Sequence, residues 1–191
     1  MMFIKDKLIL IGASTGGPGH LKKIFTSLDS GFSTPVIIAQ HMNCVFIKSF
    51  VKQFDDELPF NFYLADSKHD IKKHSVHICG THCEISKRDG HLKLQSTNNV
   101  ISNYNPSVDC LFNSAIELCS DYDVLAVLLT GIGSDGAKAM SNLKDAGATC
   151  IAESEESAIV YGMPKKAAEF NSKIKVMNLN DIIKYIKRFG N

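Results

Sequence analysis

Short runs of apolar residues, each about the length of a buried β-strand, recur along the chain and are separated by more polar segments. Most of these runs do not alternate with polar residues, which is typical of strands that are covered on both faces. The expected strands are Leu8–Ile11, Val36–Ala39, Phe60–Leu64, Val76–Cys79, Val124–Leu129, Thr149–Ala152 and Ile174–Val176.

Helical patterns occupy several of the intervals between these strands, because apolar residues recur there at steps of three and four. The expected apolar faces are Leu21, Ile24, Phe25 and Leu28; Leu111, Phe112, Ala115, Ile116 and Cys119; Ala139, Met140 and Leu143; and Leu179, Ile182, Ile183 and Ile186. Buried strands that alternate with helices predict an α/β fold, with a doubly wound, mainly parallel sheet and helices on both faces.

One section departs from this alternation. Residues 77–95 have the pattern of a strand, a turn at Arg88-Asp89-Gly90 and a second strand, in which Leu92 and Leu94 alternate with polar residues. Asp-Gly is a favoured hairpin turn, so we expect an antiparallel hairpin appended to the parallel sheet. No internal repeat or low-complexity linker interrupts the sequence, and we expect residues 1–191 to form a single domain.

Composition narrows the range of partners. Of the 191 residues, 45% are hydrophobic and 21% are charged, as in an ordinary soluble domain. The formal net charge of +1 favours neither nucleic acid nor an anionic membrane surface, and we expect neither as a partner. No segment approaches the roughly 20 apolar residues that cross a bilayer. The six cysteines lack the spacing of a disulfide scaffold, so we expect free thiols and a cytoplasmic protein.

The first apolar strand leads directly into Gly12-Ala13-Ser14-Thr15-Gly16-Gly17. Glycine tolerates the positive φ and the close backbone approach of a sharp turn between a strand and a helix. The spacing Gly-x-Ser-x-Gly is that of a nucleophile elbow, which holds a serine hydroxyl clear of the sheet. A simpler alternative is that Ser14 caps the helix that follows.

Two further polar residues follow buried strands. His41 comes directly after Pro35–Gln40, and Asp135 lies in the glycine-rich segment Thr130–Gly136 behind the most apolar strand. The carboxyl ends of parallel strands share one edge of the sheet, where catalytic side chains gather, so we expect Ser14, His41 and Asp135 to meet there. The alternatives are a turn histidine with its ring in water and an aspartate that caps its own helix.

A serine, a histidine and an acid on one rim predict nucleophilic catalysis. His41 would take the proton from Ser14 Oγ as this oxygen attacks an acyl carbon, and Asp135 would fix the imidazole tautomer. The backbone N–H groups of Thr15 and Ile132 are the candidate oxyanion donors, and one such donor is typically worth about 3 kcal/mol. The chain order Ser, His, Asp differs from that of the α/β-hydrolases.

These residues lie in segments that resemble the catalytic domain of the chemotaxis receptor protein-glutamate methylesterases. The matching segments are Ile11-Gly-Ala-Ser-Thr-Gly-Gly-Pro18, Pro35-Val-Ile-Ile-Ala-Gln-His-Met42, Pro106-Ser-Val-Asp-Cys-Leu-Phe112, Leu128-Leu-Thr-Gly-Ile-Gly-Ser-Asp-Gly-Ala137 and Val160-Tyr-Gly-Met-Pro164. The resemblance implies a triad of Ser14, His41 and Asp135, with Thr15 beside the nucleophile. It also implies that no cofactor is used, that the substrates are methylated glutamates on the cytoplasmic helices of chemoreceptors, and that receptor glutamines are deamidated by many members.

The sequence departs from the family pattern in three respects. Methionine is usual where Ile132 stands, so the backbone donor is kept while the pocket wall changes. The family's proline-glycine turn after the fourth strand is replaced by Cys79-Gly80-Thr81-His82, and Glu84 stands at the position of the usual histidine. The receiver domain that precedes the family's catalytic domain is not in this sequence. We therefore expect a free-standing member, the alternative being a piece of a longer protein.

Three other functions compete with this interpretation. Gly12–Gly19, together with Tyr161 and Lys165, suggests an NAD(P)-binding reductase. Against it, Pro18 stands where the phosphate loop needs an N–H, and no acidic residue closes the second strand. The histidines and cysteines of residues 74–91 suggest a metal-binding module, although their spacing fits no zinc knuckle. An adaptor with an inactive site would leave the intact triad residues unexplained.

Overall fold

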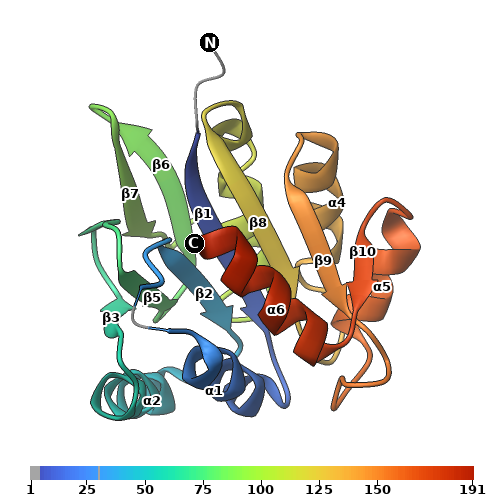
Figure 1. The fold of residues 1–191 in the computed structure, drawn as a ribbon. Helices are drawn as coiled ribbons and strands as arrows, with labels where there is room; N and C mark the ends of the chain where they lie inside the picture. Colours follow the sequence, from blue (N-terminus) through green and yellow to red (C-terminus); the bar gives the residue numbers. More distant parts are fainter. Residues whose placement is uncertain (1–4, 30) are drawn as a thin grey trace.

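The computed structural model describes residues 5–29 and 31–191, whose centre is a seven-stranded sheet (Figure 1). The strand order is β10-β9-β8-β1-β2-β5-β3, and every neighbouring pair is parallel. The strands are β1 (Asp6–Ala13), β2 (Val36–Gln40), β3 (Asn61–Ala65), β5 (Ser75–Cys79), β8 (Tyr122–Leu128), β9 (Thr149–Glu153) and β10 (Lys175–Met177). Each expected strand is present, so the predicted parallel sheet is confirmed.

β1 lies in the middle of the sheet, with β2 on one side and β8 on the other. Its residues 8–13 are all buried, as expected for a continuous apolar strand. The chain runs outward from β1 in one direction first and returns to its other side only with β8. At the carboxyl ends of β1 and β8, the two loops therefore lead to opposite faces of the sheet. A point of this kind is where the binding crevice of an α/β sheet usually lies.

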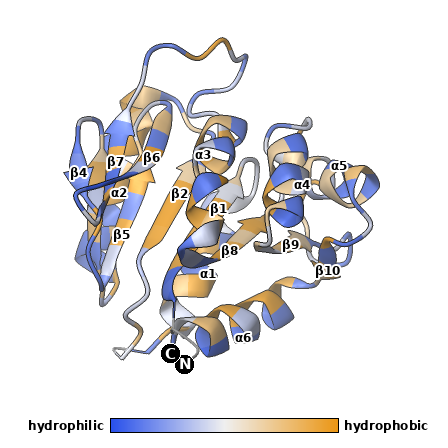
Figure 2. Ribbon diagram, turned by 90° about the horizontal axis from the view of Figure 1, so that it is seen from above, coloured by the Kyte–Doolittle hydropathy of each residue, from blue (hydrophilic) through white to orange (hydrophobic). Residues whose placement is uncertain are grey.

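Helices cover both faces of the sheet, as the periodicity predicts (Figure 2). One face is packed by α1 (Gly17–Ser27), α2 (Cys44–Glu57) and α6 (Leu179–Gly190), and the other by α3 (Val108–Ser114), α4 (Ala137–Asp145) and α5 (Met163–Phe170). The helix expected near residues 111–119 is divided in the structure. α3 ends at Ser114, and a 3₁₀ turn, Glu117–Ser120, follows it.

α2 and α5 were not among the helices expected from the sequence. α2 begins behind Asn43, whose side chain accepts a hydrogen bond of 2.9 Å from Val45 N. α5 begins at Met163, and Pro164 lies in its first turn, where the missing N–H is not needed. Tyr161 precedes this helix, so it shares no helical face with the residue that a reductase would pair with it.

The predicted antiparallel hairpin is also confirmed. β6 (Cys83–Arg88) and β7 (His91–Ser96) form it, and β4 (His69–Asp70) adds a third strand beside β7. Asp89 and Gly90 both have positive φ, 52° and 79°, as a tight hairpin turn requires. The hairpin begins later than expected, because the apolar residues around His77 belong to β5 of the large sheet.

The structure does not favour the metal-binding alternative. In residues 5–29 and 31–191, no group of three or more histidine, cysteine, aspartate and glutamate side chains could hold a metal ion. The candidate ligands have separate structural partners: His74 Nδ1 lies 3.2 Å from Phe32 O, His82 Nδ1 accepts from Ser107 N, and Cys83 is buried in the core. No helix in the described part of the chain has the length and apolar character needed to span a membrane.

Candidate active site

Ser14 lies at the carboxyl end of β1, in the sharp turn that leads into α1. Its backbone N donates to Thr130 O at 2.9 Å, and its carbonyl accepts from Gly17 N at 2.8 Å. Gly16 is the N-cap of α1, with φ of 86° and no side-chain cap hydrogen bond. The alternative that Ser14 caps the helix is therefore wrong, and its half-buried hydroxyl remains available for other chemistry.

Glycine allows the loop behind β8 to approach the Ser14 turn closely. A Cβ atom added at Gly131 would lie only 2.7 Å from Ser14 Cβ. A Cβ atom at Gly16 would lie 2.6 Å from Ile159 Cγ1. A larger residue at either position would therefore require neighbouring side chains to shift.

His41 lies at the carboxyl end of β2, next to Ser14. Its backbone N donates to Ala13 O at 2.9 Å, and Gln40 Nε2 donates to both Ser14 O and His41 O at 3.0 Å. The imidazole stacks on the Tyr104 ring, with centroids 4.7 Å apart and planes 13° apart. Only 11% of the His41 side chain is exposed, so the alternative of a ring in water is wrong.

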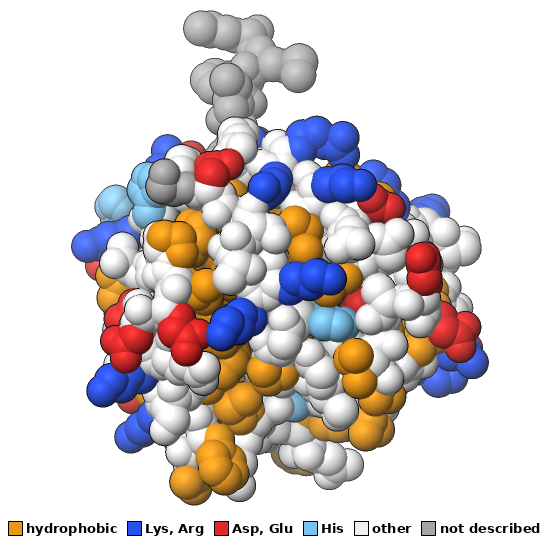
Figure 3. All heavy atoms as spheres, turned by 60° about the horizontal axis from the view of Figure 1, so that its bottom comes forward, with side chains coloured by type: hydrophobic (Ala, Val, Ile, Leu, Met, Phe, Trp, Pro, Cys, Tyr) orange, Lys and Arg blue, Asp and Glu red, His pale blue; other side chains and the backbone are white. Residues whose placement is uncertain are grey.

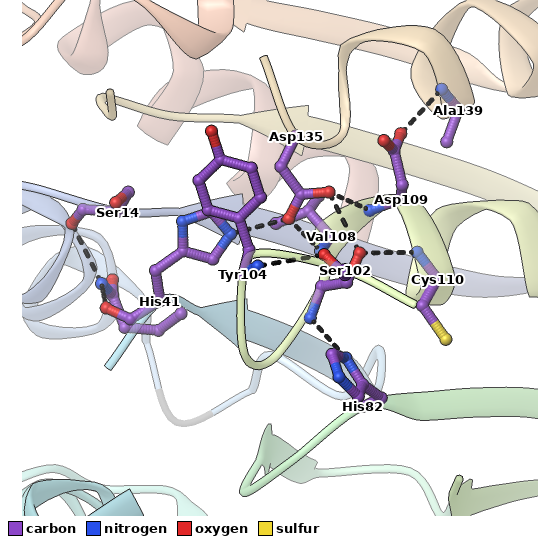
Figure 4. Close-up of polar contacts among 12 residues, drawn as sticks. Ser14, His41, His82, Ser102, Tyr104, Val108, Asp109, Cys110, Asp135 and Ala139 are labelled. Carbon is purple, nitrogen blue, oxygen red and sulfur yellow. Dashed lines mark hydrogen bonds and ion pairs between the residues drawn. The ribbon is translucent and has the colours of Figure 1, made fainter. Parts of the chain in front are cut away.

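Asp135 lies in the loop behind β8 and is held by four hydrogen bonds (Figure 4). Its Oδ2 accepts from His41 Nε2 and from Val108 N, both at 2.7 Å. Its Oδ1 accepts from Ser107 Oγ and from Asp109 N, both at 3.0 Å. The carboxylate thus sits on the N-terminus of α3, where backbone N–H groups stabilise negative charge.

The surroundings of Asp135 keep it ionised. Burial would raise its pKa, but the hydrogen bonds from His41, Asp109 N and Val108 N outweigh burial and hold the pKa below its ordinary value. The pKa of Asp109 is raised, first by burial and then by the nearby charge of Asp135. The N-cap of α4 is Gly136, so Asp135 does not cap its own helix, contrary to that alternative.

The structure joins two of the three predicted catalytic side chains directly. His41 and Asp135 are hydrogen-bonded, whereas the hydroxyl of Ser14 and the ring of His41, all in the described part of the chain, share no hydrogen bond. In Figure 4 the imidazole lies between Ser14 and Asp135. Because Asp135 accepts from Nε2, the tautomer that it favours leaves the lone pair on Nδ1.

The two predicted oxyanion donors lie beside Ser14. Thr15 follows it in the turn, and Ile132 follows Gly131 in the closely approaching loop. Both residues are exposed, and neither N–H donates a hydrogen bond to any residue that the structure describes. Both N–H groups are therefore without a partner among the described residues.

Sequence reasoning missed the residues that hold Asp135 and His41 in place. Ser107, Val108 and Asp109 lie in a segment that supports the family resemblance, but their spacing gives no sign that they bind Asp135. Tyr104 lies in an irregular loop, where no periodicity identifies an aromatic ring that will stack on His41.

Comparison with known proteins places this geometry in a family. The family model described as CheB methylesterase matches residues 9–186. The chain belongs to the CheB methylesterase family. In the crystal structure of the Thermotoga maritima CheB methylesterase catalytic domain, 99% of the chain superposes on 97% of this one, with a TM-score of 0.88 and 30% identity.

Relatives with curated names agree with this assignment. A protein-glutamate methylesterase/protein-glutamine glutaminase of Saccharophagus degradans is 35% identical over 92% of this chain and 51% of its own length. A probable protein-glutamate methylesterase of Borreliella burgdorferi is 32% identical over 96% of this chain and 49% of its own. The chain thus spans about half the length of the curated relatives it matches. These relatives are named as methylesterases, so the comparisons do not favour the alternative of an NAD(P)-binding reductase.

Proposed function

We propose that this chain is a serine hydrolase that removes methyl groups from glutamate methyl esters of chemoreceptors. The observation that carries the proposal is the 2.7 Å hydrogen bond between His41 Nε2 and the buried Asp135, at the sheet edge that also carries Ser14. Family membership and the names of the relatives support the substrate class.

The proposed mechanism gives each of the three side chains one role. His41 takes the Ser14 hydroxyl proton on Nδ1 as Oγ attacks the ester carbonyl carbon, and Asp135 stabilises the imidazolium. The N–H groups of Thr15 and Ile132 stabilise the oxyanion. His41 returns the proton to the methoxide, which leaves as methanol. Water, deprotonated by His41, then attacks the acyl-serine and releases the glutamate carboxylate and free Ser14.

The surface around this edge supports a protein as the substrate. Val45 and Phe46 lie in the first turn of α2, shortly after His41. Ile132 follows Gly131, which lies close to Ser14, and the Ile159 side chain lies close to Gly16. These four apolar side chains are between 61% and 72% exposed. Figure 3 turns this side of the molecule forward and shows hydrophobic side chains gathered on it. Exposed apolar groups around a reactive centre are typical of surfaces that bind other proteins.

We further propose that the chain is a single catalytic unit that acts in the cytoplasm on the cytoplasmic helices of chemoreceptors. The match to almost the whole of the T. maritima catalytic domain supports the first statement. The free state of all six cysteines supports a reducing compartment.

The same site would also deamidate receptor glutamines, as the names of several relatives suggest. An amide carbonyl meets the same nucleophile and oxyanion donors, and ammonia leaves in place of methanol. A receptor fragment with glutamine at its modification sites tests this second activity by mass spectrometry.

The test of the main proposal uses the purified chain and a methylated cytoplasmic receptor fragment. Mass spectrometry should show loss of methyl groups from glutamates, and Ser14→Ala should lower turnover by several orders of magnitude while the fold persists. Ser27→Ala is the matched control, because this hydroxyl donates to Lys23 O within α1. Full demethylation by Ser14→Ala, or none by the unaltered chain, would contradict the proposal.

A further inference from the structure

A second buried acid–histidine pair lies at the same edge of the sheet. Glu153 ends β9, and its side chain is 0% exposed. Its Oε2 accepts from Thr130 N at 2.8 Å and lies 3.2 Å from His20 Nδ1, while Oε1 accepts from Ser157 Oγ at 2.7 Å. Burial of a carboxyl group is tolerated when its oxygens have hydrogen-bond partners, as both oxygens of Glu153 do.

The three partners of Glu153 come from three segments around the nucleophile. His20 lies in the first turns of α1, directly behind the Ser14 turn. Thr130 opens the loop that carries Asp135, and Ser157 lies in the segment that leads to Ile159. Glu153 therefore joins α1, the loop after β8 and the segment after β9 through one carboxylate.

Thr130 passes this constraint on to the nucleophile. Its carbonyl accepts from Ser14 N at 2.9 Å, and its hydroxyl donates to Thr15 O at 2.8 Å and accepts from Val160 N at 2.9 Å. The two residues after Thr130 are Gly131, which approaches Ser14, and Ile132, a candidate oxyanion donor. Thr130 is thus hydrogen-bonded to the turn that carries Ser14 and is also continuous with the loop that carries Ile132. The ester carbonyl would react between these two segments.

We propose that Glu153 is a positioning residue for ester hydrolysis, which holds Thr130 and, through it, Ser14 and the oxyanion donors in register. Its contribution is that of a hydrogen-bond acceptor for Thr130 N. Catalytic geometry is sensitive to small displacements, so releasing Thr130 should lower turnover more than substrate binding. The inference rests on the proposed function, because it assumes that Ser14 is the nucleophile.

The test compares Glu153→Ala with Glu153→Gln. Alanine leaves Thr130 N without its acceptor, and we expect kcat to fall by roughly 10- to 100-fold with KM within about 3-fold of the unaltered chain. The glutamine oxygen can accept from Thr130 N and its amide can donate to Ser157 Oγ, so kcat should return to within about 3-fold. The rate at which a serine-reactive sulfonyl fluoride modifies Ser14 should follow kcat across these variants.

Glu155→Ala is the matched control, since this carboxylate lies two residues away in the same segment and is exposed. All variants are compared well below their unfolding temperatures, so that a purely structural loss would leave kcat per folded molecule unchanged. An unchanged kcat in Glu153→Ala, or equal losses in the alanine and glutamine variants, would overturn the inference. These outcomes leave the proposed function intact as long as Ser14→Ala remains inactive.

If Glu153→Ala does not fold, Thr130→Val and Thr130→Ser decide the matter. Valine keeps the backbone contact with Glu153 but removes the hydroxyl bridge between Thr15 O and Val160 N, and serine restores that bridge. We expect a loss of kcat of about 10-fold in the valine variant and near-normal kcat in the serine variant. Normal kcat in Thr130→Val would contradict the proposed route from Glu153 to Ser14.

Discussion

Two acid–histidine pairs lie at one edge of this sheet, and the proposed function assigns proton transfer to only one of them. His41–Asp135 and His20–Glu153 have side-chain exposures of 11% and 2%, and of 11% and 0%, so burial does not distinguish them. Both pairs bring an imidazole nitrogen within 3.2 Å of a carboxylate oxygen. What differs is the set of groups beyond each pair.

The acid of the first pair accepts hydrogen bonds from the N-terminus of α3, and its histidine lies at the end of β2, next to Ser14. The acid of the second pair accepts from Thr130 N, while its histidine lies within the helix that follows Ser14. In the proposed function, a neighbouring nucleophile and oxyanion donors make the first of these pairs catalytic. In the described part of the chain the second pair lacks these neighbours, and its hydrogen bonds hold segments of the chain together.

The sharpest way to break this comparison is to replace each histidine by glutamine. His41→Gln should lower kcat by roughly 10⁴-fold or more, because it removes the group that accepts and returns the proton. His20→Gln should lower kcat by less than about 10-fold, because Thr130 N keeps its acceptor. Steady-state kinetics on the methylated receptor fragment measures both values. Equal losses in the two variants would show that the pairs share one role.

Replacing Tyr104 tests how the first pair is aligned. Tyr104→Leu removes the ring that stacks on His41, so the imidazole gains freedom and kcat should fall by about 3- to 10-fold. Tyr104→Phe keeps the stacking surface and serves as the control. A loss of the same size in both variants would assign the effect to the hydroxyl instead of the ring.

The smallest expected effect concerns stability and pH. Burial would raise the pKa of Asp135, but hydrogen bonds from His41 and two backbone N–H groups lower it below the value in the unfolded chain. The stabilisation is therefore fully present above the unfolded pKa of about 4 and is lost as pH falls through the lower folded pKa.

We expect the difference in unfolding free energy between the unaltered chain and Asp135→Asn to shrink as pH falls from about 6 to about 3. Urea unfolding at several pH values measures it, with the exposed Glu155→Gln as the control. A difference that grows toward acid pH would mean that the hydrogen bonds do not outweigh burial at Asp135.

The features predicted correctly from the sequence are those that a few adjacent residues determine. The apolar strands and the Asp89-Gly90 turn were predicted correctly, because side-chain periodicity and positive φ are properties of a few adjacent residues. α5 was missed, because glycine and proline are common helix breakers, whereas Gly162 and Pro164 lie at the start of this helix.

The same distinction applies to the site. Ser14, His41 and Asp135 were recognisable because each follows an apolar strand, and the ends of parallel strands gather at one edge. Glu153 carries the same local signal, since it directly follows the apolar residues of β9, but no motif identified it. The backbone donors of α3 carry no sequence signal at all, because every residue except proline has an N–H.

The sequence by itself determined a parallel sheet, an antiparallel hairpin and a serine, a histidine and an aspartate at one sheet edge. Periodicity and turn chemistry fix such features over distances of a few residues. Only the tertiary structure decided that Glu153 pairs with His20, and that Asp135 binds Nε2 of His41 and so leaves the lone pair on Nδ1. Such pairings depend on strand order and on the packing of loops that are far apart in the chain, and no local pattern specifies either.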